Sequence, residues 1–255
     1  MPDCAGRVAV ITGASRGLGA ALAEDWAKRG MRLALCSRSA PALASGDAVM
    51  AEQVDVSDEK AVEFFTRAVE ERFGTIDLWI NNAGVLGPLK PIRDIRLDEF
   101  RDHLDINLTG QFLCTRAYIQ HLRRRGARAG AAGKVEGVLI NISSGAARHG
   151  HAGMAAYCAG KAGLDRLAEC AQLEEEETGL RVYAVAPGVI DTEMQTVIRA
   201  TSPDDFPAVS RFIEMKRENT FNTPGFVAEH LLAIAFDPAA RPDEVCMWLP
   251  DEVPH

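Results

Sequence analysis

The stretch that decides the fold is Arg7-Val-Ala-Val-Ile-Thr12-Gly13-Ala-Ser-Arg-Gly17-Leu-Gly19, near the start of a chain of 255 residues. Its first six residues form a short apolar, β-branched run, which predicts a buried strand. The glycine-rich segment that follows predicts a tight turn, and residues 20–29 have the apolar spacing of a helix. Residues 31–37 are a second apolar strand. This order of elements predicts a βαβ unit of a parallel sheet.

The same alternation of strands and helices continues to the end of the chain. Further strands are expected at 49–56, 76–80, 135–142, 180–186 and 245–249, and helices at 58–73, 97–124, 157–177 and 227–236. Residues 39–47 contain Pro41 and leave room for at most a stub of helix. With no internal repeat or linker, the chain is expected to form a single domain, 1–255. Its predicted architecture is α/β, a Rossmann-type doubly wound parallel sheet of about seven strands with helices on both faces.

Composition excludes several classes of protein. Hydrophobic residues make up 47% and charged residues 25%, an ordinary balance for a globular protein, and no apolar run is long enough for a membrane span. The net charge of -8 argues against nucleic acid as a partner. The six cysteines are scattered, without a C-x-x-C pair, which favours free thiols, no bound metal and a cytoplasmic location.

The glycine-rich turn has the context of a dinucleotide site. Its glycines let a pyrophosphate approach the start of the following helix, where free N–H groups and the helix dipole attract anions. The second strand ends in Ser37-Arg38, with Arg16 in the turn and no carboxylate between. Two guanidinium groups can bind the 2′-phosphate of NADP, where NAD would meet an acidic residue. The alternative is that both arginines are solvated surface residues.

Two other strand ends carry polar residues. Asp55 is expected either to accept a hydrogen bond from the adenine amino group or to serve as an ordinary strand-end cap. Asn81 and Asn82 are expected either to tie neighbouring strands together and present backbone to a ligand, or to form a plain turn.

Tyr157 and Lys161 stand four residues apart, a spacing that puts both side chains on one face of a helix. A tyrosine phenol titrates near about 10, so unaided it is a poor proton donor or acceptor at neutral pH. A neighbouring ammonium lowers the pKa of a phenol, so Lys161 is expected to tune Tyr157 into a general acid/base. Ser144, at the end of the predicted strand 135–142, can hydrogen-bond the same substrate oxygen. A single Y-x-x-x-K pair also arises by chance, so on its own it is weak evidence for a catalytic site. It becomes informative because the same chain carries the glycine-rich turn.

Three other segments carry polar groups with open interpretations. Asn107 lies among apolar residues of the predicted helix 97–124, where it either caps a local kink or holds a water beside Tyr157 and Lys161. Residues 123–133 are basic and glycine-rich, which favours a solvated loop. Residues 202–223 are rich in charge with prolines near their borders, which predicts a flap over a cleft at about 191–225.

Together these residues resemble the short-chain dehydrogenase/reductase family over essentially the whole chain. The matching motifs are Thr12-Gly-x-x-x-Gly-x-Gly19, Asn81-Asn-Ala-Gly84, Asn107, Ser144, Tyr157-x-x-x-Lys161 and Pro187-Gly188 with Thr192. The resemblance implies that Tyr157 is the acid/base, that Ser144 orients the carbonyl, and that Lys161 lowers the pKa of the tyrosine and binds the nicotinamide ribose. It implies that Asn107 supports a proton-relay water, and that hydride moves to or from C4 of the nicotinamide.

The same resemblance implies a cofactor site for NADP(H) and an assembly. The expected cofactor-binding residues are Gly13, Ser15, Arg16, Gly17, Leu18, Gly19, Ser37, Arg38, Asp55, Val56, Asn82, Ala83, Gly84, Tyr157, Lys161, Pro187, Gly188, Ile190 and Thr192. The family packs as homodimers or homotetramers through the helices that hold Asn107 and Tyr157, and this chain is expected to do the same.

Within the family the chain is most similar to the sepiapterin reductase and benzil reductase branch, on Tyr157-Cys-Ala-Gly-Lys-Ala162, Leu173-Glu-Glu175 and Ala186-Pro-Gly-Val-Ile-Asp-Thr-Glu-Met-Gln195. It departs from sepiapterin reductases on the last strand, which reads Cys246-Met247-Trp248 where they carry an acidic residue that holds the pterin. The expected activity is therefore NADPH-dependent reduction of a small ketone or vicinal diketone. Alternatives are a sepiapterin-type pterin reductase, a 3-ketoacyl-carrier reductase and a non-enzymatic NADP-sensing scaffold.

The segment between Ser144 and Tyr157 indicates the shape of the substrate. It is built mainly from glycine and alanine, which leaves room for a bulky or planar group beside the reacting carbonyl. Leu86 and Met194 are expected to add apolar contact. His149 and His151 are expected either to hydrogen-bond a second carbonyl or to face solvent.

Overall fold

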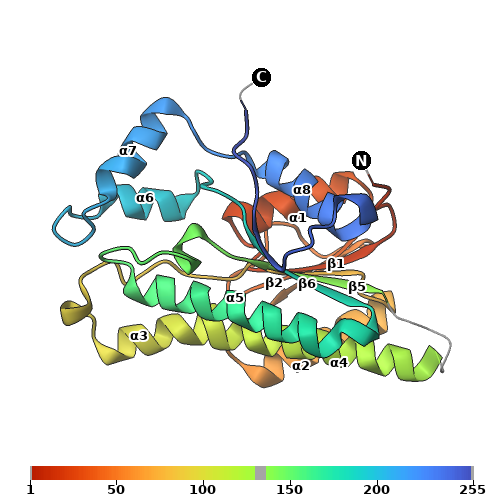
Figure 1. Cartoon of the computed structure of the whole chain (residues 1–255). Helices are drawn as coiled ribbons and strands as arrows, with labels where there is room; N and C mark the ends of the chain where they lie inside the picture. The colour runs from red at the N-terminus through yellow and green to blue at the C-terminus, as the bar shows by residue number, and fades with distance from the viewer. Residues whose placement is uncertain (1, 130–135, 254–255) are drawn as a thin grey trace.

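Seven strands form one sheet in the order β3-β2-β1-β4-β5-β6-β7 in the computed structural model, which describes residues 2–129 and 136–253 (Figure 1). The strands are β1 (Val8–Thr12), β2 (Arg32–Ser37), β3 (Val49–Gln53), β4 (Leu78–Asn81), β5 (Gly137–Ile142), β6 (Leu180–Ala186) and β7 (Cys246–Trp248). Every neighbouring pair is parallel. The strand order reverses between β1 and β4, so the predicted doubly wound fold is confirmed, with its switch point there.

Helices cover both faces of the sheet, as Figure 1 shows. One face carries α1 (Gly17–Lys28) and α8 (Pro224–Phe236), and the other carries α2 (Glu59–Phe73), α4 (Gly110–Ala129) and α5 (Ala155–Glu175). The remaining helices are α3 (Leu97–Leu104), α6 (Glu193–Ala200) and α7 (Val209–Glu218), with short 3₁₀ turns at Ile92–Asp94, Gly145–Ala147, Glu176–Thr178 and Pro238–Ala240. Over the part of the chain that the structure describes, no helix combines the length and apolarity needed to cross a membrane.

Strand β1 shows why the central strands are apolar without a break. Its alternate residues point to opposite faces, so Val8 and Val10 join the core under α2 and α4, while Ala9 and Ile11 join the core under α1 and α8. All of β1 is buried. A strand covered on both faces has no polar side, which is what its continuous apolar run predicted.

Two large aromatic side chains anchor the two cores. Trp26 of α1 and Trp79 of β4 are both fully buried, on opposite faces of the sheet. Full burial of a large apolar side chain contributes about 1.5–3 kcal/mol. Tyr118 of α4 packs on Trp79 with ring centroids 5.5 Å apart, which fixes α4 against the sheet.

The turn between β1 and α1 depends on glycine at particular positions. Gly13 and Gly17 have φ of +68° and +57°, in the left-handed region that other residues avoid. A Cβ on Gly19 would lie 2.4 Å from the carbonyl oxygen of Gly13. The helix begins at Gly17, three residues before the expected start at 20, because the turn is tighter than its length suggests.

Several boundaries differ from those expected. Strand β3 ends at Gln53 rather than at 56, because the Asp55 side chain accepts hydrogen bonds from the N–H and hydroxyl of Ser57 and turns the chain. Residues 38–48 contain no helix, so the prediction of at most a stub there is confirmed.

The long predicted helix 97–124 is divided by a π-helical turn at Asp105–Thr109, and α4 then continues to Ala129. The prediction of a loop over 123–133 is therefore wrong as far as residue 129. Arg123 pairs with Glu175 of α5 and Arg124 with Glu70 of α2, which holds this part of the chain against the neighbouring helices. Residues 130–135 lie outside the described residues, and so does the first residue of the predicted strand 135–142.

Candidate active site

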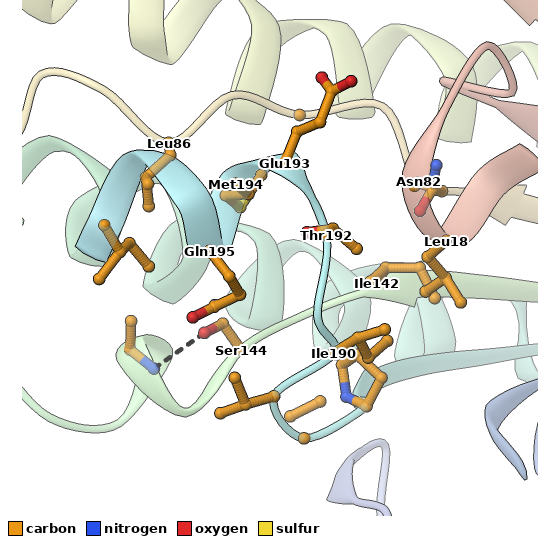
Figure 2. Close-up of a pocket in the computed structure, with 18 of the residues that line it drawn as sticks. Leu18, Asn82, Leu86, Ile142, Ser144, Ile190, Thr192, Glu193, Met194 and Gln195 are labelled. Carbon is orange, nitrogen blue, oxygen red and sulfur yellow. Dashed lines mark hydrogen bonds between the residues drawn. The ribbon is translucent and has the colours of Figure 1, made fainter. Parts of the chain in front are cut away.

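One cleft of about 1960 Å³ runs along the carboxyl ends of the strands, where an open parallel α/β sheet binds its ligands. It contains 19 of the 21 different residues that the sequence marked as catalytic or cofactor-binding. The two that do not line it are Gly19, which packs behind the turn against Gly13, and Asn107, which is completely buried behind the cleft wall. Figure 2 shows part of this lining around Ser144.

Tyr157 and Lys161 extend from the first turns of α5, and Ser144 comes directly after β5. The Lys161 ammonium lies 5.8 Å from the centre of the Tyr157 ring and donates a hydrogen bond to the Ile142 carbonyl oxygen at 2.7 Å. The Ser144 hydroxyl oxygen accepts from the Ala146 N–H at 3.2 Å. The structure thus brings the three side chains to one end of the cleft, as the sequence predicted.

Burial, rather than the neighbouring lysine, dominates the pKa of the phenol. Desolvation raises the pKa of Tyr157 above its usual range, and the hydroxyl of Ser144 opposes that rise. The expectation that Lys161 lowers the pKa of Tyr157 is not met in this structure, because the ammonium points to the Ile142 carbonyl. Burial also lowers the pKa of Lys161 to about 8, against the attraction of Asp165. At neutral pH both groups therefore carry their protons.

Asn107 lies inside the π-helical turn and is completely buried. Its amide donates to the Val85 carbonyl at 2.7 Å and accepts from the Val85 N–H at 2.8 Å. The same Nδ2 lies 2.7 Å from Nε2 of His103, while Nδ1 of His103 lies 2.6 Å from the Gly87 carbonyl. This network requires the neutral His103 tautomer with the proton on Nδ1. Of the two interpretations of Asn107, the structure agrees with the local kink, which is the π-helical turn. The Asn107 side chain hydrogen-bonds Val85 in the loop after β4.

The two asparagines at the end of β4 tie strands together, which confirms one of the two interpretations. Asn81 donates to the Asn141 side-chain oxygen at 2.8 Å, across to β5. Asn82 donates to the Thr12 carbonyl at 2.9 Å, across to β1, and the Thr12 hydroxyl accepts from the N–H groups of Asn82 and Ala83. The switch point is thereby fixed at the floor of the cleft.

The residues at the other end of the cleft fit a dinucleotide. A Cβ at Gly13 would lie 2.7 Å from the Ala83 Cα, and one at Gly188 would lie 2.6 Å from the Asn222 amide. Within the described chain, no side chain caps the start of α1 and no acidic residue lies in its first turn. Its N–H groups are therefore free to meet an anionic pyrophosphate. Asp55 is engaged with Ser57 and acts as a strand-end cap, while still lining the cleft.

The two arginines expected to meet a 2′-phosphate have different surroundings. Arg38 is exposed at the mouth of the cleft, beside Asp55. Arg16 is also exposed but forms an ion pair with Glu193 of α6, at 2.5 Å. This pair joins the glycine-rich turn to the segment that was predicted as a flap. Glu193 was not among the expected site residues, because an acidic residue at the start of a helix is an ordinary feature of sequences.

The substrate end of the cleft is apolar. A small cluster separate from the two main cores lies there, made of Leu86, Met154, Ile198, Phe206 and Val209, with Tyr157 and Met194 packed against it. The Arg148 guanidinium lies 4.4 Å from the centre of the Trp248 ring on β7, and Trp248 lines the cleft. His149 is exposed and His151 partly so.

Comparison with known proteins agrees with this geometry. Residues 7–203 match the profile of the short chain dehydrogenase family. The chain is 34% identical over 232 residues to benzil reductase ((S)-benzoin forming) of Bacillus subtilis strain 168, covering 88% of this chain and 91% of that enzyme. It is 33% identical over 243 residues to 3-oxoacyl-[acyl-carrier-protein] reductase of Synechocystis sp. strain PCC 6803, covering 92% and 91%.

A solved structure shows the same fold. The 3-ketoacyl-(acyl-carrier-protein) reductase of Brucella melitensis, complexed with NADH, superposes with a TM-score of 0.80 at 26% identity, covering 96% of this chain and 97% of that one.

Proposed function

The chain belongs to the short-chain dehydrogenase family, and from that premise we propose that it is an NADPH-dependent carbonyl reductase for a small ketone or vicinal diketone. Enzymes of this family are oxidoreductases that use a nicotinamide cofactor. The observation that carries the proposal is the meeting of Ser144, Tyr157 and Lys161 in the same cleft as the glycine-rich turn. The 34% identity to a benzil reductase supports the substrate class.

The reaction needs a hydride at the carbonyl carbon and a proton at the carbonyl oxygen. A nicotinamide held in this cleft would supply the hydride. Ser144 donates a hydrogen bond to the carbonyl oxygen and orients it. Tyr157 gives that oxygen its proton, and Lys161, one helical turn further on, would hold the nicotinamide ribose. Desolvation raises the pKa of Tyr157, so at neutral pH the phenol carries the proton that carbonyl reduction requires.

The alternatives have less support. The basic residues that a carrier protein would use lie at the end of α4, which precedes β5 and so lies at the opposite edge of the sheet from the cleft. Arg123 pairs there with Glu175 at 2.7 Å, and Arg124 pairs with Glu70 at 3.2 Å. A pterin would lack an acidic partner on β7.

The test is a comparison of substrates with saturating NADPH. We expect a higher kcat/KM for benzil than for sepiapterin, because the substrate end is apolar and loss of a charge-assisted contact weakens binding by about 1.5–3 kcal/mol. A clear preference for sepiapterin would contradict the proposal and assign the anchoring to Asp191 or Glu193. No turnover of any ketone would favour the sensing scaffold.

Cofactor choice is expected to depend on Arg16 and Arg38. A charge-assisted contact to phosphate contributes roughly 1.5–3 kcal/mol, which is about ten- to hundredfold in affinity. Replacing Ser37→Asp together with Arg38→Leu should therefore reverse the preference toward NADH, measured as the ratio of kcat/KM for the two cofactors. Equal use of NADH and NADPH by the unaltered enzyme would refute this assignment.

We also propose that residues 191–225 form a flap on a single catalytic domain, 1–255. Its helices α6 and α7 pack on each other beyond the sheet (Figure 1). The Arg16–Glu193 ion pair connects α6 to the turn after β1. Closure of such a segment excludes water from the reacting carbonyl.

Assembly and location are part of the same proposal. Phe112 of α4 is 42% exposed, and together with Leu108, Leu167 and Cys170 it lines an apolar groove between α4 and α5. We propose that two or four copies pack through this face as a homodimer or homotetramer. All six cysteines are free thiols, which suits the cytoplasm.

A further inference from the structure

One polar group at the substrate end has no role in the reaction as described so far. Gln195, in the first turn of α6, is 8% exposed and lines the cleft. Its side-chain oxygen is buried and has no hydrogen-bond partner among the described residues. Figure 2 shows the side chain directed toward Ser144, from the opposite wall of the cleft.

An ordinary structural role for Gln195 would be helix capping. Thr192-Glu-Met-Gln195 has the pattern of a capping box, in which the glutamine would bond back to the N–H of the cap residue. The structure does not use it this way. The Thr192 side chain makes no cap, and its carbonyl accepts only backbone hydrogen bonds within the described residues, from the N–H groups of Gln195 at 2.9 Å and Thr196 at 3.3 Å. The carboxamide is therefore free to point into the cleft.

The Gln195 carboxamide is a polar group among mainly apolar neighbours. Met194 and Ile198 belong to the apolar cluster that closes this end of the cleft, and Leu86 lies on the same side. Most buried amide groups in proteins have hydrogen-bond partners. Among the described residues Gln111 Oε1 and Asn141 Nδ2 also lack one, but only Gln195 of these three lines the cleft, where a bound ligand can supply the partner. A group that reaches toward Ser144 from the opposite wall lies beside the carbonyl that Ser144 orients.

We propose that Gln195 is a specificity-determining residue that hydrogen-bonds a second oxygen, on the carbon next to the reacting carbonyl. The inference rests on the proposed function and narrows its substrate class to 1,2-dicarbonyl compounds. The carboxamide presents either its N–H₂ to a carbonyl or its oxygen to a hydroxyl by rotation about its last bond. His149 and His151 are more exposed than Gln195, so we assign the hydrogen bond to this second oxygen to Gln195 and not to either histidine.

The test compares two substrates that differ only at that oxygen. Benzil carries the second carbonyl, and deoxybenzoin has a methylene group in its place. Gln195→Met keeps the length of the side chain and removes its polar atoms. We expect it to lower kcat/KM for benzil about tenfold more than for deoxybenzoin, the contribution of a neutral hydrogen bond. Comparing the variant with the unaltered enzyme cancels the different intrinsic reactivities of the two ketones.

A matched control comes from the same helix. Thr196 is exposed and lies outside the cleft lining, so Thr196→Val removes a neighbouring polar group and should leave the benzil to deoxybenzoin ratio as it is. The melting temperature of Gln195→Met should not fall, because the side chain has no partner to lose within the described structure. Gln195→Leu serves as a second apolar variant.

Two results would overturn the inference while the proposed function stands. One is an equal loss for benzil and deoxybenzoin, which would mean that Gln195 only shapes the pocket. The other is a marked fall in the melting temperature of both apolar variants, which would mean a structural role. Failure of the unaltered enzyme to reduce either ketone would instead refute the proposed function.

Discussion

Replacing Tyr157→Phe is expected to lower kcat for carbonyl reduction by about a hundred- to ten-thousandfold, while the Kd for NADPH changes little. The substitution removes only the hydroxyl that gives its proton to the substrate oxygen, and a positioned general acid contributes an effect of this size. The ring still fills its place against the apolar cluster at the substrate end. Steady-state kinetics with benzil and a fluorescence titration with NADPH measure the two quantities.

The control is a tyrosine elsewhere in the same chain. Tyr183 lies in β6, packed in the core and outside the cleft lining. Tyr183→Phe should keep a normal rate. If Tyr157→Phe retained a tenth of the rate of the unaltered enzyme, Tyr157 would not be the acid/base.

Lys161→Met is expected to abolish most of the activity and to raise the stability of the protein at pH 7. Lys161 is 6% exposed, and burial lowers its pKa from 10.5 to about 8. At about 1.4 kcal/mol for each pKa unit, holding the charge inside the fold costs about 3 kcal/mol. Methionine avoids that cost and loses the bond to the Ile142 carbonyl, worth about 1 kcal/mol. A net gain of about 2 kcal/mol should raise Tm by a few degrees.

The gain in the free energy of unfolding from Lys161→Met should depend on pH. An improvement in packing alone would not. The folded pKa lies below the unfolded one, so between about pH 8 and 10.5 the unfolded chain binds more protons at Lys161 than the folded chain. The contribution of Lys161 to stability therefore rises with pH across that window, and the advantage of Lys161→Met shrinks. Urea denaturation at pH 7 and pH 10 measures it. A variant that is less stable than the unaltered protein at both pH values would contradict the burial argument.

The fold was predictable because its strands are covered on both faces. The run that became β1 is apolar up to Thr12, and β5 is apolar apart from Asn141, so the sequence pattern alone indicated both strands. What the pattern did not show is backbone geometry between regular elements. The π-helical turn at Asp105–Thr109 keeps the apolar period of the helices around it, and the early end of β3 depends on one side-chain bond from Asp55.

The site was predictable where chemistry requires a particular residue type at a particular spacing, as with Tyr157 and Lys161. Three residues were missed because the sequence has a simpler interpretation for each. Glu193 begins α6, where an acidic residue is an ordinary feature. His103 lies on the buried side of an amphipathic helix, where a histidine usually belongs to the core. Gln195 completes a capping-box pattern with Thr192. The direction of the Tyr157 pKa was wrong because the degree of burial depends on the tertiary structure.

The measurement that tests the central claim most directly follows the hydride itself. The enzyme is incubated with benzil and NADPH that carries deuterium at C4 of the nicotinamide, and the product is analysed by mass spectrometry. The proposal predicts benzoin with deuterium on the carbinol carbon, formed in equal amount to the NADPH consumed, and almost none with Tyr157→Phe. Consumption of NADPH without deuterated benzoin, or no consumption with any ketone, would contradict the assignment of this cleft as a carbonyl reductase.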